Sequence, residues 1–243
     1  MRLVFQHMPK CAGTSVNLAL LKHFSSSQVF REKLNRVENY SAKELLECDY
    51  FSGHYDAWRV GLIPGPKTVF TVLREPKSRI ISLYNFWRSL TWDYINEHDL
   101  GGPRLAKSLP FEEFLTIPDR GIPSNIDNTY LRNALGRCED PAVARLIKDD
   151  PSKALGKAFR YYSSLDFIGF MEDLDEVKKF LSSELSVASI QLPRTNTIEN
   201  IKDVPYREPI SSLVISDEAD KLLDRKILYD QQIYDYFRSY PMT

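Results

Sequence analysis

The sequence predicts an α/β protein with a P-loop-like central parallel β-sheet flanked by helices and a helix-rich C-terminal half. Short apolar runs, rich in β-branched and aromatic residues, occur at 3–5, 49–52, 68–73 and 166–170, as expected for buried strands. Two of these runs pass through turns into amphipathic patterns with helical spacing. With 243 residues, of which 43% are hydrophobic, the chain can bury one sizeable core. We therefore expect roughly four or five strands in a single domain spanning 1–243.

The segment after the first predicted strand has the composition of an anion-binding loop. Its ten residues, FQHMPKCAGT at 5–14, lead into an amphipathic run from Val16 to Phe24. The first amides of a helix lack intrahelical partners and the helix dipole adds partial positive charge, so an anion is favoured there. Gly13 permits close approach of the backbone, and Lys10 adds a mobile charge.

An ordinary βα turn with a capping Thr or Ser would contain the same residues, so the loop alone leaves both interpretations open. A Walker A loop of ATP-binding proteins reads GxxxxGK[ST], whereas here Lys10 precedes Gly13. No acidic Walker B strand is evident either. The spacing therefore disfavours an ATP-type loop.

Two charged residues, Arg74 and Glu75, follow the strand predicted at Thr68 to Leu73. Arg74 follows it directly, and Pro76 is suited to the first position of a helix that we expect to extend to about Trp92. Open α/β sheets bind ligands at the carboxyl ends of their strands.

Ser78 and Ser82 are four apart and share a face of the helix predicted to start at Pro76, with Arg79 about a quarter-turn round from them. A guanidinium group with a serine hydroxyl suits a phosphate monoester, although solvation is the commoner fate of Arg residues such as Arg74 and Arg79 at a helix start.

Further elements follow from local signals. Ser41 to Glu44 reads as a capping box that opens a short helix ending at Glu47, just before the strand at 49–52. Glycines and prolines between Asn96 and Pro110 predict a loop. Helices are expected at Asp173 to Ser186 and, capped by Ser216, through Phe237.

The two segments HMPKCAGTS at 7–15 and TVLREPKSRIISLYNFW at 71–87 together resemble the paired signature of sulfotransferases that use 3′-phosphoadenosine 5′-phosphosulfate (PAPS). More narrowly, the chain is similar to the carbohydrate branch that includes the uronosyl and heparan 2-O-sulfotransferases. FSGHYD at 51–56, DNTYLRNALG at 127–136 and DFIGFMEDLDE at 166–176 support this resemblance. It implies transfer of a sulfuryl group from PAPS to a carbohydrate or glycoconjugate hydroxyl, with 3′,5′-ADP as the product and no metal.

The resemblance also implies roles for individual residues. Lys10 matches the lysine that contacts the bridging oxygen during transfer, and Arg74 with Ser82 matches the pair that binds the 3′-phosphate. The loop that would bind the 5′-phosphosulfate comprises Lys10, Cys11, Ala12, Gly13, Thr14 and Ser15.

His54, in SGHYD, matches a histidine that is taken to deprotonate the sugar hydroxyl. An imidazole has an ordinary pKa of about 6.5 and can accept a proton near neutral pH. The alternative is a strand-end histidine satisfied by backbone partners. The branch often has a second histidine nearby, where this chain has Ser52, which weakens a strict 2-O assignment. His7 is expected to shape the phosphate loop or contact the nucleotide.

The acceptor side is less defined. By resemblance, Arg132 in the DNxxxR element would contact a sugar carboxylate or sulfate, with a solvated Arg as the alternative. Tyr84, Trp87 and Trp92 are expected to stack on a sugar ring or to pack internally. The segment 96–110 is a candidate border of the acceptor cleft. In relatives, the loop equivalent to 192–206 covers the nucleotide, so Arg194, Asn196 and Lys202 are further candidates.

Composition limits the partners. The net charge of −1 argues against a general polyanion-binding surface, so we expect no nucleic-acid partner and a neutral or lightly charged glycan, or else a localised basic groove. The three cysteines, without CxxC spacing, indicate reduced thiols. No signal peptide is visible, and no apolar run approaches the roughly 20 residues that span a bilayer. A bacterial cytosolic enzyme is the expectation.

Two rival functions remain open at this point. A P-loop kinase would use ATP with Mg²⁺, but the position of Lys10 and the missing Walker B acid disfavour it. A non-catalytic nucleotide-binding protein would keep Lys10 and Arg74 but would lack a base near the donor.

Overall fold

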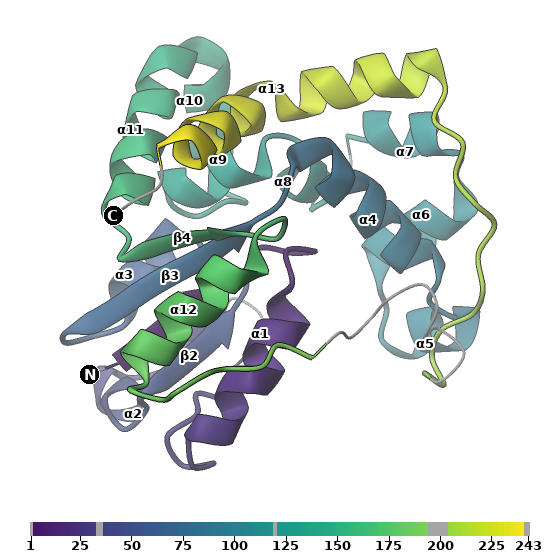
Figure 1. Ribbon diagram of the computed structural model, residues 1–243. Helices are drawn as coiled ribbons and strands as arrows, with labels where there is room; N and C mark the ends of the chain where they lie inside the picture. The colour runs from purple at the N-terminus through teal and green to yellow at the C-terminus, as the bar shows by residue number, and fades with distance from the viewer. Residues whose placement is uncertain (1, 33–35, 119–120, 194–203, 241–243) are drawn as a thin grey trace.

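The computed structural model describes residues 2–32, 36–118, 121–193 and 204–240 of the chain. At its centre lies a four-stranded, all-parallel sheet with the strand order β2-β1-β3-β4 (Figure 1). The strands are β1 (Arg2–Gln6), β2 (Tyr50–Gly53), β3 (Lys67–Leu73) and β4 (Phe167–Phe170). The α/β class and the parallel sheet predicted from the sequence are therefore confirmed.

The described α-helices surround this sheet and dominate the C-terminal half. They are α1 (Gly13–Leu20), α2 (Ala42–Leu46), α3 (Ala57–Leu62), α4 (Pro76–Arg88), α5 (Trp92–Glu97), α6 (Gly101–Ser108), α7 (Phe111–Thr116), α8 (Ile122–Ile126), α9 (Thr129–Leu135), α10 (Pro141–Asp149), α11 (Pro151–Ser163), α12 (Leu174–Glu184) and α13 (Asp217–Ser239). Two short 3₁₀ turns, Leu21–His23 and Val37–Asn39, follow α1 and precede α2.

The two faces of the sheet pack against different helices, because successive side chains of a strand point to opposite faces. Leu3 and Phe5 pack in one core with residues of α1 and α12. Val4, between them, packs in a second core with residues of α3, α9, α11 and α13. Figure 1 shows the sheet between these two groups of helices.

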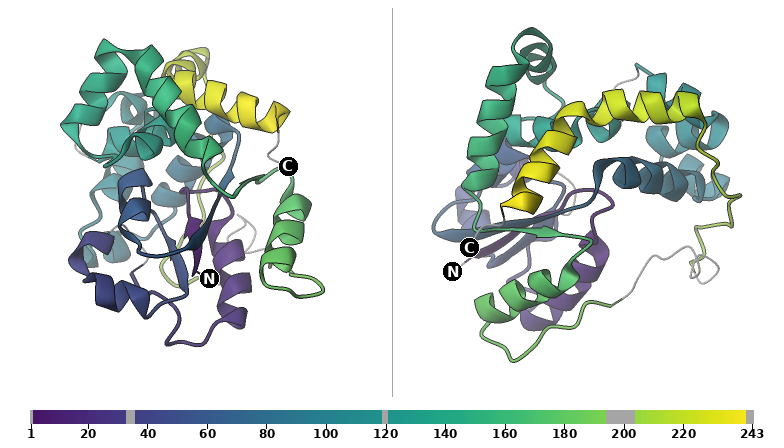
Figure 2. Two further views of the ribbon diagram at one scale, coloured as in Figure 1. Left: turned by 90° about the vertical axis from the view of Figure 1, so that its left-hand side faces the viewer. Right: turned by 45° about the horizontal axis from the view of Figure 1, so that its top comes forward.

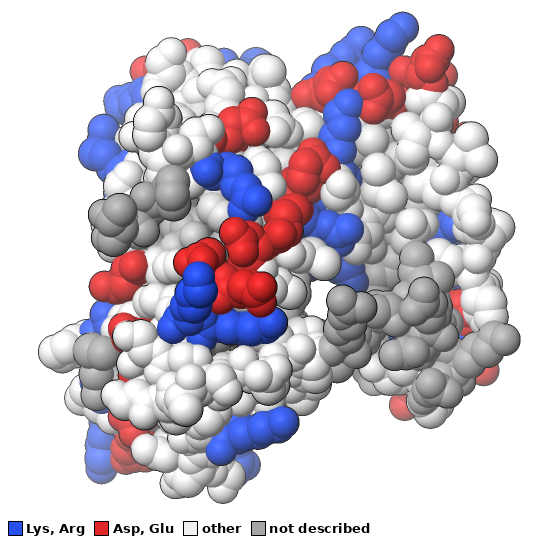
Figure 3. All heavy atoms as spheres, viewed as in Figure 1, with Lys and Arg blue, Asp and Glu red and all other residues white. Residues whose placement is uncertain are grey.

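A third core lies beyond the carboxyl ends of the strands. It joins α4, α6, α7, α8 and the first part of α13, for example through Ile80, Phe114 and Leu223. The right-hand view of Figure 2 shows α13 crossing from this helical part to the sheet. Figure 3 shows the surface hollowed between the two parts, with charged side chains of both signs around the hollow.

One predicted helix and one predicted loop differ clearly from the structure. The helix from Pro76 ends at Arg88, where the amide of Ser89 bonds to the carbonyls of Asn85 and Phe86, and α5 then starts with Thr91 as its cap. The predicted loop at 96–110 contains α6. Its glycines and Pro103 fall in the first turn of that helix, where an amide hydrogen is not needed, so they do not break it.

The caps predicted for two helices are present in the structure. The Ser41 side chain accepts from the Glu44 amide and the Glu44 carboxylate accepts from the Ser41 amide, so the capping box is confirmed, although α2 ends at Leu46. Ser216 caps α13 by accepting from the amide of Ala219. Among the described helices, none combines the length and apolarity required to cross a bilayer.

Candidate functional site

The sequence-predicted residues Lys10, His54 and Arg74 follow three adjacent parallel strands. Gln6, at the end of β1, is in register with Gly53 of β2 and Thr71 of β3, so the segments that follow these strands emerge at the same edge of the sheet. The amide of His7 donates to the carbonyl of Gly53 at 2.9 Å and extends the pairing by one residue. This edge is the ligand-binding edge of open α/β folds.

The loop between β1 and α1 is held by its buried side chains and has a strained backbone. Met8 and Cys11 are 1% and 0% exposed and lie in the core. Lys10 and Ala12 have φ angles of 69° and 58°, in the left-handed region that residues with a Cβ atom rarely adopt. Such strain persists where the surroundings impose it, and turns with left-handed residues can aim backbone amides at an anion.

Gly13 is required by the position of His7. A Cβ atom built on Gly13 would lie 1.6 Å from Nε2 of His7, well inside van der Waals contact. The His7 ring therefore covers the first residue of α1, as expected for a histidine that shapes the loop.

Lys10 lies in a group of cations. Its Nζ is 3.9 Å from the centroid of the Phe86 ring. Burial lowers the pKa of Lys10 to about 7, and the charges of Arg207 and Arg74 contribute to this decrease. Among the described residues, no carboxylate forms an ion pair with any of these three cations.

The backbone of Arg74 is held in place by the side chain of Tyr130. The Tyr130 hydroxyl donates to the Arg74 carbonyl at 2.7 Å and accepts from its amide at 3.1 Å. The same hydroxyl lies 3.5 Å from Sγ of Cys11. The guanidinium of Arg74 makes a long contact of 3.5 Å with the Lys10 carbonyl. Tyr130 of α9 thus joins the first loop to the end of β3.

Arg207 was not predicted from the sequence. Its Nε donates to Ser89 Oγ at 3.1 Å, its guanidinium lies 5.1 Å from the Phe86 ring centroid, and its buried Nη1 has no hydrogen-bond partner. Burial lowers the pKa of Arg207. An isolated Arg after a polar loop carries no local signal that could have identified it.

The imidazole rings of His54 and His7 are in contact in a tilted arrangement, with ring centroids 4.5 Å apart and planes inclined by 34°. Nδ1 of His54 lies 2.9 Å from the His7 carbonyl oxygen, which only accepts, so Nδ1 carries the hydrogen and Nε2 of the neutral ring keeps its lone pair. Burial lowers the pKa of His54, opposed by this hydrogen bond and reinforced by Lys10. Burial, His54 and Lys10 together lower the pKa of His7. Both rings are therefore neutral at pH 7.

The Cys11 thiol is a structural group. Burial raises its pKa to about 11, so it stays protonated near neutral pH. Cys11, Cys48 and Cys138 are all free.

The remaining predicted residues differ in their surroundings. Ala12 is the left-handed N-cap of α1, followed by Thr14, which is exposed, and Ser15, which is partly exposed. Ser82 is partly exposed on α4, and within the described chain no polar contact joins it to Arg74 or to the loop.

Arg132 is 8% exposed, and its Nη2 donates to Oδ2 of Asp127 at 2.8 Å, while its Nε donates to the Asp127 carbonyl. Oδ1 of Asn128, in the same sequence element, accepts from the Tyr229 and Asp230 amides of α13. The contacts within the chain thus account for the guanidinium of Arg132, and its contact with an acceptor stays a prediction. Arg194, Asn196 and Lys202 lie outside the described residues.

The described residues contain one cluster of groups suited to metal binding. Asp56, Cys138 and Glu139 bring their ligand atoms within 4.8 Å of one another. The guanidinium of Arg59 donates to Asp56 and to Glu139, and it also pairs with Glu38. A cation of the chain itself thus balances these carboxylates.

No protein-family model matches the chain, and no curated protein matches it either. The functional assignment therefore rests on the site itself.

Proposed function

We propose that this protein transfers a sulfuryl group from PAPS to a hydroxyl group of a carbohydrate or glycoconjugate. The observation that carries the proposal is the group formed by Lys10, Arg74 and Arg207, three cations next to a strained loop at a helix start, none of them ion-paired within the described residues. Unpaired cations that repel one another are costly unless an anion joins them.

The spacing of the cations along two βα units supports a ligand with two phosphate groups. Lys10 and the amides at the start of α1 suit the 5′-phosphosulfate end of PAPS. Arg74, at the start of the α4 segment, suits the 3′-phosphate, with Ser82 farther along the same helix. The unpartnered Nη1 of Arg207 offers one more donor to the nucleotide.

The proposed chemistry needs a base and a stabilised leaving group. Nε2 of His54 accepts the proton of the acceptor hydroxyl as its oxygen bonds to sulfur. The bond between sulfur and the bridging oxygen breaks, and negative charge develops on the 5′-phosphate of 3′,5′-ADP. The protonated Lys10 and the loop amides stabilise that charge. An anion raises the pKa of Lys10 from about 7, which favours its charged form in the complex.

Calorimetric titration tests the proposal against its rivals. We expect 3′,5′-ADP to bind in the presence of EDTA and more tightly than ATP with Mg²⁺. Preference for ATP·Mg²⁺ would favour a kinase. Binding of 3′,5′-ADP without any transfer of labelled sulfate from PAPS to a broad set of glycans would favour a non-catalytic nucleotide-binding protein.

A further inference from the structure

A pocket of about 560 Å³ lies beside the proposed donor site. It is bordered by α4, α5, the start of α6, α8 and the chain at Tyr206, so the segment at 96–110 does border a cavity. Phe86 is part of its wall, and the same ring lies 3.9 Å from Nζ of Lys10. The pocket and the proposed sulfuryl-transfer position therefore share one side chain.

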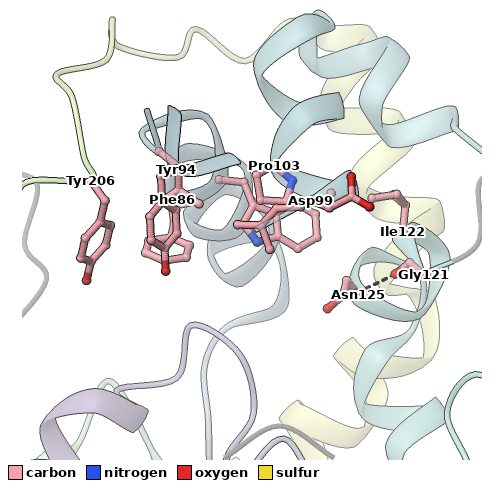
Figure 4. Close-up of a pocket in the computed structure, with 13 residues that line it drawn as sticks. Phe86, Tyr94, Asp99, Pro103, Gly121, Ile122, Asn125 and Tyr206 are labelled. Atoms are coloured by element: carbon pink, nitrogen blue, oxygen red, sulfur yellow. Dashed lines mark hydrogen bonds between the residues drawn. The ribbon is translucent and has the colours of Figure 1, made fainter. Parts of the chain in front are cut away.

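The wall of the pocket is rich in aromatic rings. Tyr94 and Tyr206 stack with centroids 4.7 Å apart and planes inclined by 25°. Figure 4 shows Tyr94 beside Phe86 and Tyr206 next to them. Trp87 adds a further ring, and a Cβ atom on Gly102 would lie 2.8 Å from it, so that glycine lets the indole pack against the start of α6. Rings of this kind offer flat apolar surfaces for stacking.

The polar groups of the wall do not favour an anion. Asp99 contributes a carboxylate and Asn125 an amide whose Nδ2 donates to the Gly121 carbonyl at 2.6 Å. No Lys or Arg is among the described residues that line the pocket. The Asp99 side chain is 89% exposed and pairs with Arg104 at 3.2 Å, and Arg104 itself does not line the pocket. A uronate or a sulfated sugar would therefore find no cation in the described wall, whereas sugar hydroxyls can donate to the side-chain oxygens of Asp99 and Asn125.

On the basis of the proposed function, we infer that this pocket binds the acceptor and that the acceptor is a neutral sugar. Its ring stacks on the aromatic wall and its hydroxyls bond to the polar groups, which places one hydroxyl toward Lys10 and His54. This specificity differs from that of the uronosyl branch that the sequence resembles.

The test uses labelled PAPS and defined acceptors. Methyl glycosides of glucose, galactose, mannose and N-acetylglucosamine are compared with methyl glucuronide, methyl galacturonide and p-nitrophenol. We expect at least one neutral glycoside to be sulfated with a kcat/KM at least about tenfold above those of both uronides and the phenol. Preference for a uronide or for the phenol, or sulfation of none of these compounds, would overturn the inference.

Matched variants test the location. Tyr94→Ala should lower kcat/KM for the best neutral glycoside by about tenfold, mainly through KM, while the Kd for 3′,5′-ADP changes less than about twofold. Trp92→Ala is the control, because Trp92 lies on the same helix, is 43% exposed and does not line the pocket. Equal effects of the two variants would exclude the pocket as the acceptor site.

The two proposals fail differently. If 3′,5′-ADP does not bind, the proposed function fails. If it binds to wild type and to Tyr94→Ala alike, which also shows that the variant is folded, and acceptor kinetics do not change, only the pocket assignment fails.

Discussion

Lys10 shows how far the environment changes a single residue. Its pKa falls to about 7 because it is buried near two guanidinium groups, so near neutral pH the free protein contains both charged and neutral Lys10. A phosphate group would restore the charge. Anion binding at this site would therefore be accompanied by uptake of a proton by Lys10.

Proton uptake upon nucleotide binding is the first prediction. At pH 8, where Lys10 of the free protein is mostly neutral, binding of 3′,5′-ADP should take up close to one proton, because the phosphate raises the pKa of the amine. Titration calorimetry in two buffers with different ionisation enthalpies measures this number. Lys10→Arg keeps the charge at all relevant pH values and should abolish the uptake. A buffer-independent enthalpy for wild type would contradict the prediction.

The second prediction concerns His54. His54→Ala should reduce sulfuryl transfer by roughly 10²- to 10⁴-fold while the affinity for 3′,5′-ADP stays nearly unchanged. Because the pKa of His54 is lowered, transfer by wild type should decline only below pH 6.5, where the imidazole becomes protonated and can no longer accept a proton. His23→Ala, at an exposed histidine after α1, is the control. Retained turnover of His54→Ala would remove His54 from this role.

Arg59 gives a prediction about stability. It is 2% exposed and pairs with Asp56, which is fully buried, and with two glutamates. Burial raises the pKa of Asp56 despite this pairing, whereas hydrogen bonds from Arg59 lower the pKa of the more exposed Glu139 to about 2. Arg59→Met leaves these carboxylates without their cation and should lower the free energy of unfolding by about 3–5 kcal/mol.

Urea unfolding at pH 7 measures this change. Arg137→Met is the matched control, because the Arg137 side chain is 46% exposed and its ion pairs with Glu38 and Glu139 lie at the surface. That substitution should cost only about 0–1 kcal/mol. A similar loss of unfolding free energy for both variants would show that the buried ion pairs contribute no more to stability than the surface pairs do.

At the scale of elements, the junction of β1 and α1 depends on one glycine. Gly13→Ala places a methyl group on the His7 ring, so either the ring or the loop has to move. We expect a weaker affinity for 3′,5′-ADP by at least about tenfold and a lower Tm. Gly61→Ala is the control, because Gly61 lies in α3 with nothing within 4 Å of the added Cβ, and it should stabilise the protein by about 0.5–1 kcal/mol.

A double variant identifies the cause. His7→Ala removes the ring that Gly13→Ala would strike, so the combination should recover stability relative to Gly13→Ala alone. Strictly additive losses in thermal melts would mean that the clash is not the reason for the glycine.

At the scale of the whole molecule, the proposed nucleotide joins two βα units of the sheet to a distant segment. A ligand at 100 times its Kd adds about 2.7 kcal/mol to the free energy of unfolding. For a chain of this size we expect 3′,5′-ADP to raise Tm by roughly 5–10 °C. Arg74→Ala should reduce this shift but leave the smaller shift caused by 5′-AMP unchanged. Equal reductions for both nucleotides, measured by differential scanning fluorimetry, would place the 3′-phosphate elsewhere.

The sequence by itself determined the sheet and its edge. Apolar runs identified the four strands of the described residues, and the segment after each run had to leave the sheet at the carboxyl ends of its parallel strands, which brings Lys10, His54 and Arg74 to one edge. Local capping signals also located the starts of α2, α4 and α13, because a helix cap involves only residues that are neighbours in the chain.

Only the tertiary structure decided which side chains surround that edge. Tyr130 contacts both Cys11 and Arg74, Arg207 lies near Lys10, and the His7 ring contacts the His54 ring, although no spacing in the sequence relates these residues. From the sequence, Arg79 and Arg132 are candidates for binding an anion, as Arg74 is, but in the structure they are only 0% and 8% exposed. Periodicity and capping act over one turn of helix or one strand, whereas these contacts depend on how the helical part packs beyond the carboxyl ends of the sheet.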